Sequence, residues 1–366
     1  MSQYDLSGRC ALVTGPKGRT GSWRRPHVIG VWCGAQPTAR RPAEDRVPPL
    51  EGLTAARVRA PVGPVFATLL AMPARRLAGL VALTVTTLLA ATPSASAAPV
   101  PLPRPDHVLV VVMENKDPGE IIGNASAPYL TGLARAGASF TDAHAETHPS
   151  QPNYLALFSG STQGVTDNGC DHRLTAPNLG SALLASGRTF AGYSEGLPQA
   201  GSTVCTAGRY ARKHSPWVNF TDLPGATTNL PASTVGTAWD GLPTVAFLTP
   251  DLCHDMHDCP VSAGDAWAKA TLGSYLAWAG THNSLLVLTF DESETRTPGN
   301  PIATVLAGPM VTPGRYPDRI DHYSLLRTIE DMYGLGPLGA SADRNPITDI
   351  WRAPLTTAPE APASRR

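Results

Sequence analysis

The chain has 366 residues, of which 42% are hydrophobic and 16% charged, a composition that suits one large or two small globular domains and excludes disorder throughout. The formal net charge of zero hides an asymmetry, because residues 98–366 contain 17 lysines and arginines against 25 aspartates and glutamates. Such an acidic balance repels polyphosphate chains, so it argues against a nucleic-acid partner, although one cationic pocket could still hold a single phosphate.

Residues 1–71 open with a motif that resembles the start of a short-chain dehydrogenase, LSGRCALVTGPKGRTG. That family expects Thr-Gly, three residues, Gly, one residue and Gly, whereas here Gly15 is followed by Gly18 and Gly21. No tyrosine in the chain is followed four positions later by lysine, and the next stretch is rich in Arg and Pro without a helical period. We therefore predict no complete nucleotide-binding fold here and interpret residues 1–71 as a mispredicted N-terminal extension.

The segment MPARRLAGLVALTVTTLLAATPSASAAP, which starts at Met72, has the three-part layout of a secretory signal peptide. Two arginines precede an apolar run at 77–89, and small residues follow, ending at 95–97. The run is too short to cross a bilayer comfortably as a permanent anchor; a buried core helix is the alternative. We expect translation from Met72, a signal peptide over 72–97, and a secreted protein without a stable membrane anchor.

Four cysteines follow the signal segment: Cys170, Cys205, Cys253 and Cys259. An even number suits two disulfides in an oxidising compartment, and three pairings are formally available. We favour 170–205 and 253–259. The alternative for CHDMHDC is a zinc site, although its cysteines bracket the histidines without a usual finger spacing.

Apolar, β-branched runs predict strands at 107–113, 244–250, 284–290 and 303–309. Helical patterns lie between and after these runs, at 127–137, 176–187, 265–280 and 322–334. This alternation predicts an α/β fold with a largely parallel central sheet and helices on both faces, in which active groups gather at the carboxyl ends of the strands.

Two stretches lack a strong periodic pattern. Residues 195–240 are rich in Gly, Pro, Ser and Thr, so we predict a long excursion over the active face. Residues 353–366 lack the apolar content to pack, so we predict a disordered tail.

Pairs of oxygen-bearing side chains follow two predicted strands, Glu114-Asn115 after the first and Asp291-Glu292 after LLVLTF. At two strand ends of one sheet these side chains can converge on a hard divalent cation such as Mg, Ca or Mn, and Zn is not excluded. The alternative is that acidic residues simply begin solvated loops.

Ser150 lies in ETHPSQPNYLALFSG (146–160), two residues before Pro152, where an apolar helical pattern begins. A serine there can cap the helix. The free N–H groups and the positive end of the helix would also hold an anionic phosphoryl group beside the hydroxyl. A plain N-cap and a nucleophile are both open interpretations, and they are compatible.

Several histidines are predicted in loops or at helix starts, where imidazole can bind a metal, protonate a leaving group or contact phosphate. Any one of them alone is more often structural; their clustering favours a site. They are His148, His214, His254, His257 and His322.

Six motifs occur in the order seen in the bacterial phosphoesterase family that holds acid phosphatases and phospholipase C enzymes, a branch of the alkaline phosphatase superfamily. They are VVVMENK, THPSQPNYLALFSG, YARKHSPW, PDLCHDMHDC, LTFDES and DHYSLLRTIEDMYGL. The resemblance spans about residues 105–352 and implies an alkaline phosphatase-like fold for a catalytic domain at 98–352. SQPNYLALFSG also resembles the nucleophile helix of the related nucleotide pyrophosphatases.

The resemblance implies metal ligation by Glu114, Asn115, Asp291 and Glu292, with Ser150 as the nucleophile and a metal-facing oxygen. His214 and His322 match histidines that line the phosphate site in the acid phosphatase branch. Of these two we predict His322 as the general acid and His214 as a phosphate contact.

Weaker expectations concern the neighbours of these residues. His257 and Asp255 fall where relatives with two metals place further ligands, and His148 is a further candidate. Thr147 is the alternative nucleophile. Asp321 stands where the family pattern has Thr, so its carboxylate would orient His322 and raise the pKa of that imidazole, or would simply be exposed.

The prediction is therefore a secreted, metal-dependent phosphoesterase that hydrolyses phosphate monoesters of small molecules or lipids through a phosphoseryl intermediate. A phospholipase C-type phosphodiesterase is the alternative within the family. An NAD(P)-dependent short-chain oxidoreductase, which would need residues 1–71, and a non-catalytic secreted binding module are the alternatives from other classes. The sequence leaves the metal, the substrate and the oligomeric state open.

Overall fold

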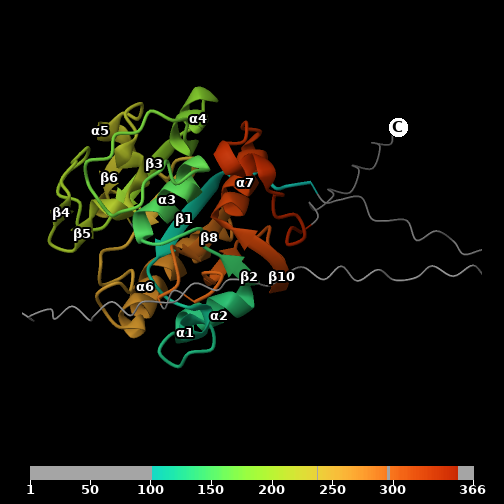
Figure 1. Cartoon of the computed structure of the whole chain (residues 1–366). Helices are drawn as coiled ribbons and strands as arrows, with labels where there is room; N and C mark the ends of the chain where they lie inside the picture. Colours follow the sequence, from blue (N-terminus) through green and yellow to red (C-terminus); the bar gives the residue numbers. More distant parts are fainter. Residues whose placement is uncertain (1–100, 237, 295–296, 353–366) are drawn as a thin grey trace, which may run out of the picture. The chain divides into compact units, whose positions relative to one another are not determined.

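The computed structural model describes residues 101–236, 238–294 and 297–352 (Figure 1). At its centre is an eight-stranded sheet in the order β10-β2-β9-β8-β1-β7-β3-β6. Its middle strand β1 (His107–Met113) pairs in parallel with β8 (Ser284–Phe290) on one side and β7 (Val245–Thr249) on the other. Because these three apolar strands are covered on both faces, they form the core that fixes the site.

The outer strands complete a mixed sheet. On one side β3 (Phe190–Ser194) pairs in parallel with β7 and β6 (Asn229–Pro231). On the other side β2 (Ala138–His144) pairs in parallel with β10 (Gly314–Asp321), while β9 (Thr304–Ala307) is antiparallel to both β2 and β8. The predicted largely parallel sheet is thus confirmed, with β9 as its antiparallel strand.

Helices lie on both faces of the sheet, as predicted. Figure 1 shows α3 (Ser150–Ser159), α4 (Leu179–Ala185) and α7 (His322–Tyr333) on one side and α1 (Pro118–Ile121), α2 (Pro128–Ala136) and α6 (Val261–Ala279) on the other. The Asp265 carboxylate on α6 accepts hydrogen bonds from the Leu130 and Tyr129 amides at the start of α2, which joins these two helices.

The predicted excursion at 195–240 contains only short strands and helices. They are the hairpin of β4 (Thr206–Ala207) and β5 (Tyr210–Ala211), η1 (Arg212–His214), η2 (Pro216–Asn219), α5 (Gly225–Thr228), β6 and η3 (Ala232–Thr234). Thr249 Oγ1, at the end of β7, donates to the His214 carbonyl at 3.2 Å. The excursion is therefore tied to the carboxyl end of the sheet. The last 3-10 helix of the described residues, η4 (Gly339–Asp343), follows α7 in the chain and packs against it.

Both predicted disulfides are present, Cys170–Cys205 and Cys253–Cys259. The second one removes the zinc alternative, because the two thiols of CHDMHDC are bonded to each other. Within the described residues, no helix has both the length and the apolar content to cross a membrane. The predictions for the extension at 1–71, the signal peptide at 72–97 and the tail at 353–366 fall outside the described residues.

Candidate active site

The two predicted pairs of oxygen ligands meet because they follow neighbouring strands in register. Met113 of β1 and Phe290 of β8 are paired, so the next residues, Glu114 and Asp291, lie at the same edge of the sheet. The Asp291 amide donates to the Met113 carbonyl at 2.9 Å, and the Glu114 amide donates to the Asp255 carbonyl at 2.8 Å. The loop after β7 therefore adds Asp255 to the same place.

Four carboxyl groups are buried here together. Glu114, Asp255 and Asp291 are fully buried and Glu292 is 5% exposed. Burial, together with repulsion from Glu114 and Glu292, raises the pKa of Asp291 well above its ordinary value. Burial likewise raises the pKa of Asp255, with a further contribution from the charge of Glu114. So many buried carboxyl groups are costly unless a positive charge joins them.

The donor set fits a divalent cation. The Asp291 Oδ1 atom accepts a hydrogen bond from the Asn115 amide at 2.9 Å, whereas its Oδ2 atom is buried and has no hydrogen-bond partner among the described residues. Asn115 has a positive φ of 53°, and its Nδ2 donates to Glu114 Oε2 at 2.6 Å. Carboxylate oxygens with spare lone pairs beside an amide are the ligands that hard cations prefer.

Ser150 is the first residue of α3, and it is not the helix cap. The N-cap position is Pro149, which makes no side-chain cap hydrogen bond. Ser150 is 2% exposed, and its Oγ donates to Glu114 Oε2 at 3.1 Å. The hydroxyl thus points at the carboxylate cluster, which corrects the plain N-cap interpretation.

The turn before α3 is held by the buried side chain of Asn153. Its Oδ1 accepts from the amides of Glu146 and Thr147, both at 3.0 Å, and its Nδ2 donates to the Thr147 carbonyl at 2.9 Å. This clamp fixes the direction in which Ser150 leaves the turn.

The helix start offers fewer free amides than expected. The Gln151 amide donates to Asn168 Oδ1 at 2.9 Å, and Pro152 has no N–H group. Two of the first three helical positions therefore have no free amide to donate to an anion at this helix start.

His214 lies between two of the buried carboxylates. Its Nε2 is 3.0 Å from Glu114 Oε1, and its Nδ1 is 3.2 Å from Asp255 Oδ2. Burial alone would lower the pKa of His214, but the charge of Glu114 and the contact with Asp255 raise it. Burial has the opposite effect on an acid and alone would raise the pKa of Glu114, yet the charge of His214 lowers that pKa to about 2. The two groups therefore favour each other's charged forms.

The arrangement does not support the acid role predicted for His322. Its Nε2 donates to the Asp291 carbonyl at 3.1 Å, which leaves the buried Nδ1 without a proton. Burial lowers the pKa of this imidazole to about 4, against a smaller opposite effect of the Asp321 charge, so at neutral pH it has no proton to give on Nδ1. Asp321 does not orient it either, because that carboxylate caps α7 through the Ser324 amide and pairs with Arg344 at 2.6 Å.

The weaker candidates have separate positions. His148 Nδ1 lies 2.8 Å from Glu292 Oε2, so it contacts the cluster from the turn before α3. Thr147 Oγ1 donates to the neighbouring His148 carbonyl. Unlike the Ser150 hydroxyl, it makes no hydrogen bond to the carboxylate cluster among the described residues. His257 Nε2 accepts from Lys213 Nζ at 3.1 Å, an arrangement that commits this nitrogen to the lysine instead of a second metal.

Two residues of the site were not predicted from sequence. Tyr154 donates to Glu114 Oε1 at 2.5 Å, and its ring stacks on His214 with the centroids 5.1 Å apart. Tyr154 follows Ser150 by four residues, so both lie on the same face of α3. This spacing is the feature of the sequence that could have predicted Tyr154 as part of the site. The other residue is Lys213, whose only signal was its place beside His214.

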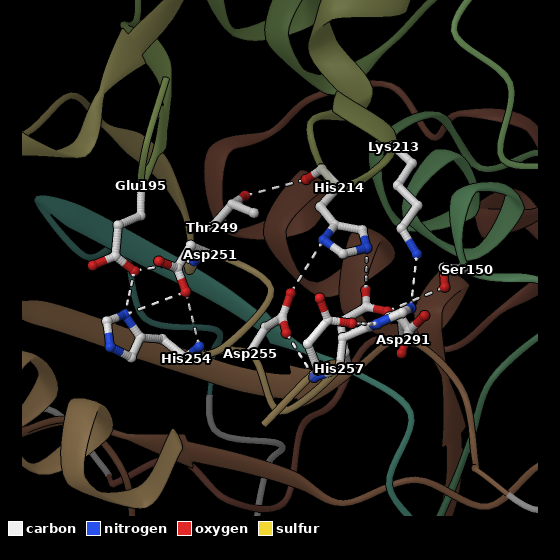
Figure 2. A network of polar contacts seen from close by, with 12 residues as sticks. Ser150, Glu195, Lys213, His214, Thr249, Asp251, His254, Asp255, His257 and Asp291 are labelled. Carbon is white, nitrogen blue, oxygen red and sulfur yellow. Dashed lines mark hydrogen bonds and ion pairs between the residues drawn. The ribbon is translucent and has the colours of Figure 1, made fainter. Parts of the chain in front are cut away.

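A second group of potential ligands lies at the ends of β3 and β7, where Glu195, Asp251 and His254 bring one ligand atom each within 4.8 Å of one another (Figure 2). His254 Nδ1 already contacts Glu195 Oε2 at 2.8 Å, and all three side chains are partly exposed. We assign no ion to this group.

The chain resembles known phosphatases in sequence. A family model described as the Phosphoesterase family matches residues 123–336. The phosphatidylinositol-3-phosphatase of Mycobacterium tuberculosis is 50% identical over 264 residues, which cover 71% of this chain and 88% of that protein. A probable acid phosphatase of Kluyveromyces lactis is 31% identical over 257 residues, which cover 63% of this chain and 58% of that protein.

Among solved structures, a protein of the alkaline phosphatase superfamily from Vibrio parahaemolyticus aligns with a TM-score of 0.47 and 11% identity. The alignment covers 68% of this chain and 72% of that one.

Proposed function

The chain belongs to the Phosphoesterase family and is a hydrolase acting on phosphoric ester bonds, and from this premise we propose that it hydrolyses phosphate monoesters with Ser150 as the nucleophile. The observation that carries the proposal is the contact of Ser150 Oγ with Glu114, in a cluster of buried carboxylates that fits a divalent cation. That cluster gives a serine hydroxyl a setting for attack on phosphorus that a structural serine would not need.

The residues that would hold the cation are Glu114, Asn115, Asp291 and Glu292, with the Ser150 hydroxyl facing it. A bound divalent ion would supply positive charge beside the nucleophile and the phosphoryl oxygens. The sequence and the fold leave its identity open among Mg, Ca, Mn and Zn.

The proposed reaction has two steps, transfer of the phosphoryl group to Ser150 and hydrolysis of the resulting phosphoserine. Ser150 Oγ attacks phosphorus, the bond from phosphorus to the ester oxygen breaks, and the serine proton passes to solvent, because Glu114 has a lowered pKa and is assigned to the cation. The leaving alkoxide takes a proton from solvent. Water then attacks phosphorus and the bond to Ser150 Oγ breaks. A proton from the water returns to the serine oxygen, and inorganic phosphate is released.

The two histidines organise this site through their contacts with Glu114, Asp255 and Asp291. His214 lies between Glu114 and Asp255 and contacts both carboxyl groups, and Tyr154 stacks on its ring. His322 holds the Asp291 backbone through its carbonyl. We therefore propose a positioning role for His322 in place of the acid role expected from sequence.

The proposed substrates include monoesters on lipid head groups. The M. tuberculosis relative is named for the removal of a 3-phosphate from phosphatidylinositol, which is a monoester of a ring alcohol. The match covers 88% of that relative, so the same class of ester is a reasonable substrate for this chain. Cleavage of the phosphodiester of a phospholipid is the alternative.

The test of the proposal is direct identification of the covalent intermediate. Purified protein is mixed with p-nitrophenyl phosphate and a divalent cation, quenched in acid within milliseconds and digested for mass spectrometry. We expect phosphate on the peptide that contains Ser150. Phosphate on Thr147, or none on any residue during rapid turnover, would contradict the phosphoseryl route.

Secretion is also part of the proposal, and the two disulfides support it because such bonds persist in oxidising compartments. Expression from Met72 in a secreting host, followed by N-terminal sequencing of the exported protein, should give a start near Ala98. Retention in the cytoplasm with residues 72–97 intact would contradict it.

A further inference from the structure

Lys213 lies beside His214 in the excursion at 195–240, and its side chain extends toward the carboxylate cluster. The residue lies on η1, and its Nζ donates to His257 Nε2 at 3.1 Å. Figure 2 shows the side chain extending toward His257, on the side of the cluster where Ser150 lies. The charge of Lys213 is one of the smaller causes of the lowered pKa of Glu114, the carboxylate that accepts from Ser150.

The ammonium group is held in place by a chain of two further residues. An ammonium group can only donate, so His257 Nε2 must accept, and the ring proton is then on Nδ1. That Nδ1 donates to Asp258 Oδ1 at 2.7 Å. His257 and Asp258 therefore fix the direction of Lys213.

The loop that carries this chain is itself constrained. The Cys253–Cys259 disulfide closes it, and the His257 amide donates to Asp255 Oδ1 at 2.8 Å. The Asp258 amide donates to the Leu252 carbonyl at 2.7 Å. These bonds restrain the backbone that carries His257 and Asp258, whose side chains are exposed, and so favour one direction for the Lys213 ammonium group.

The charge of Lys213 differs from that of His214 in one respect. His214 lies between two carboxylates, which offset its charge. Among the residues that the structure describes, no carboxylate forms an ion pair with Lys213, and its hydrogen-bond partner is the imidazole ring of His257. The positive charge remains available to an anion that enters the site.

We propose that Lys213 selects phosphate monoesters over diesters by pairing with the second negative charge that a monoester dianion carries and a diester lacks. This inference rests on the proposed function, of which it names the specificity determinant. His257 and Asp258 are positioning residues that act through Lys213.

The test compares kcat/KM for p-nitrophenyl phosphate and for bis-p-nitrophenyl phosphate at one pH, with saturating divalent cation. Lys213→Met should lower the monoester value about 10- to 100-fold, the usual effect of a charge-assisted contact, and the diester value less than about threefold. Lys213→Arg should recover part of the monoester value. Lys269→Met, which removes an exposed lysine on α6, is the matched control and should change neither.

The positioning role has its own readout. His257→Ala should lower the ratio of monoester to diester activity, and His257→Gln should restore part of it, because the glutamine carbonyl can accept from Lys213. Lys213→Gln keeps a polar side chain of similar length and serves where the methionine variant folds poorly. For either Lys213 variant, inorganic phosphate should inhibit about tenfold more weakly than it inhibits the wild type.

The outcomes separate the two proposals. A wild type that prefers monoesters, with a ratio unchanged in Lys213→Met and Lys213→Gln, would overturn the role of Lys213 alone. A wild type that hydrolyses the diester better than the monoester would overturn the proposed function itself.

Discussion

At the residue scale, the site is defined by an excess of buried carboxyl groups over buried positive charges. Glu114 is ionised beside His214, while Asp255 and Asp291 both have pKa values raised by burial first and by neighbouring charge second. A cation that binds here must displace protons from groups with raised pKa values. Its affinity should therefore increase as the pH rises.

We predict that binding of the metal ion releases protons, because burial raises the pKa values of Asp255 and Asp291. Isothermal titration calorimetry in HEPES and in Tris buffer, which have different ionisation enthalpies, would measure the release from the difference in heat. Equal heats in both buffers would show that the carboxyl groups are already ionised. Ser150→Ala, which removes no carboxyl group, should release the same number.

His322 tests the assignment of roles among the histidines. If it only orients Asp291, His322→Asn should lower kcat by a similar factor, about tenfold, for p-nitrophenyl phosphate and for glycerol phosphate. A general acid would matter far more for glycerol phosphate, because an alkoxide is a much poorer leaving group than nitrophenolate. A loss at least tenfold larger for glycerol phosphate would restore the acid role.

The residues that directly follow apolar strands could be placed from sequence, because parallel strands in register bring their ends together. Glu114 and Asp291 are the clear cases. Tyr154 and Lys213 could not be placed in this way. Their roles depend on where α3 and the excursion at 195–240 meet the sheet, and no local pattern fixes that contact.

At the scale of single elements, α3 presents Ser150 to the carboxylate cluster because its entry turn is clamped. All ten of its residues are buried, so the helix has no polar face to reveal an orientation from sequence. Asn153 supplies the orientation through its contacts with the Glu146 and Thr147 backbone.

Asn153→Ala should therefore lower the free energy of unfolding by about 2–4 kcal/mol, since it leaves the partly buried amides of Glu146 and Thr147 without this acceptor. It should also reduce turnover, because Ser150 loses its fixed direction. Chemical denaturation alongside an activity assay measures both effects. Asn124→Ala, in a loop where the side chain accepts a single amide bond, should cost less than about 1 kcal/mol. Equal costs for the two variants would contradict the clamp.

The long, buried strands β1 and β8 could be read from sequence to the residue, since continuous apolar runs are typical of central parallel strands. The strands β2, β3, β6 and β10 were not predicted. β10 has mostly partly exposed or exposed residues, and its pattern contains Pro317, so it lacks the signal of a buried strand. Its place comes from pairing with β2, which is a tertiary contact.

At the scale of the whole molecule, two disulfides hold the loops that bring residues to the sheet. Cys170–Cys205 joins positions 35 residues apart, whereas Cys253–Cys259 joins positions 6 apart and encloses Asp255 and His257. Loop length predicts a contribution of about 4 kcal/mol for the first and about 2 kcal/mol for the second.

Replacing each pair by serine should therefore separate stability from activity. The variant without Cys170–Cys205 should lose more unfolding free energy, and the variant without Cys253–Cys259 should lose more turnover of p-nitrophenyl phosphate. Denaturant titrations and initial rates on both variants measure the two quantities. The reverse order in activity would show that the loop at 253–259 does not position the site.

The central claim is that a serine at the start of α3 carries out covalent phosphoryl transfer. It is tested most directly by the turnover of p-nitrophenyl phosphate by wild type and Ser150→Ala, with added divalent cations and with chelator. We predict cation-dependent turnover that falls at least about a thousandfold in the alanine variant, since a group acting in the covalent step contributes at that order. Turnover that survives the substitution in a folded variant would contradict the account.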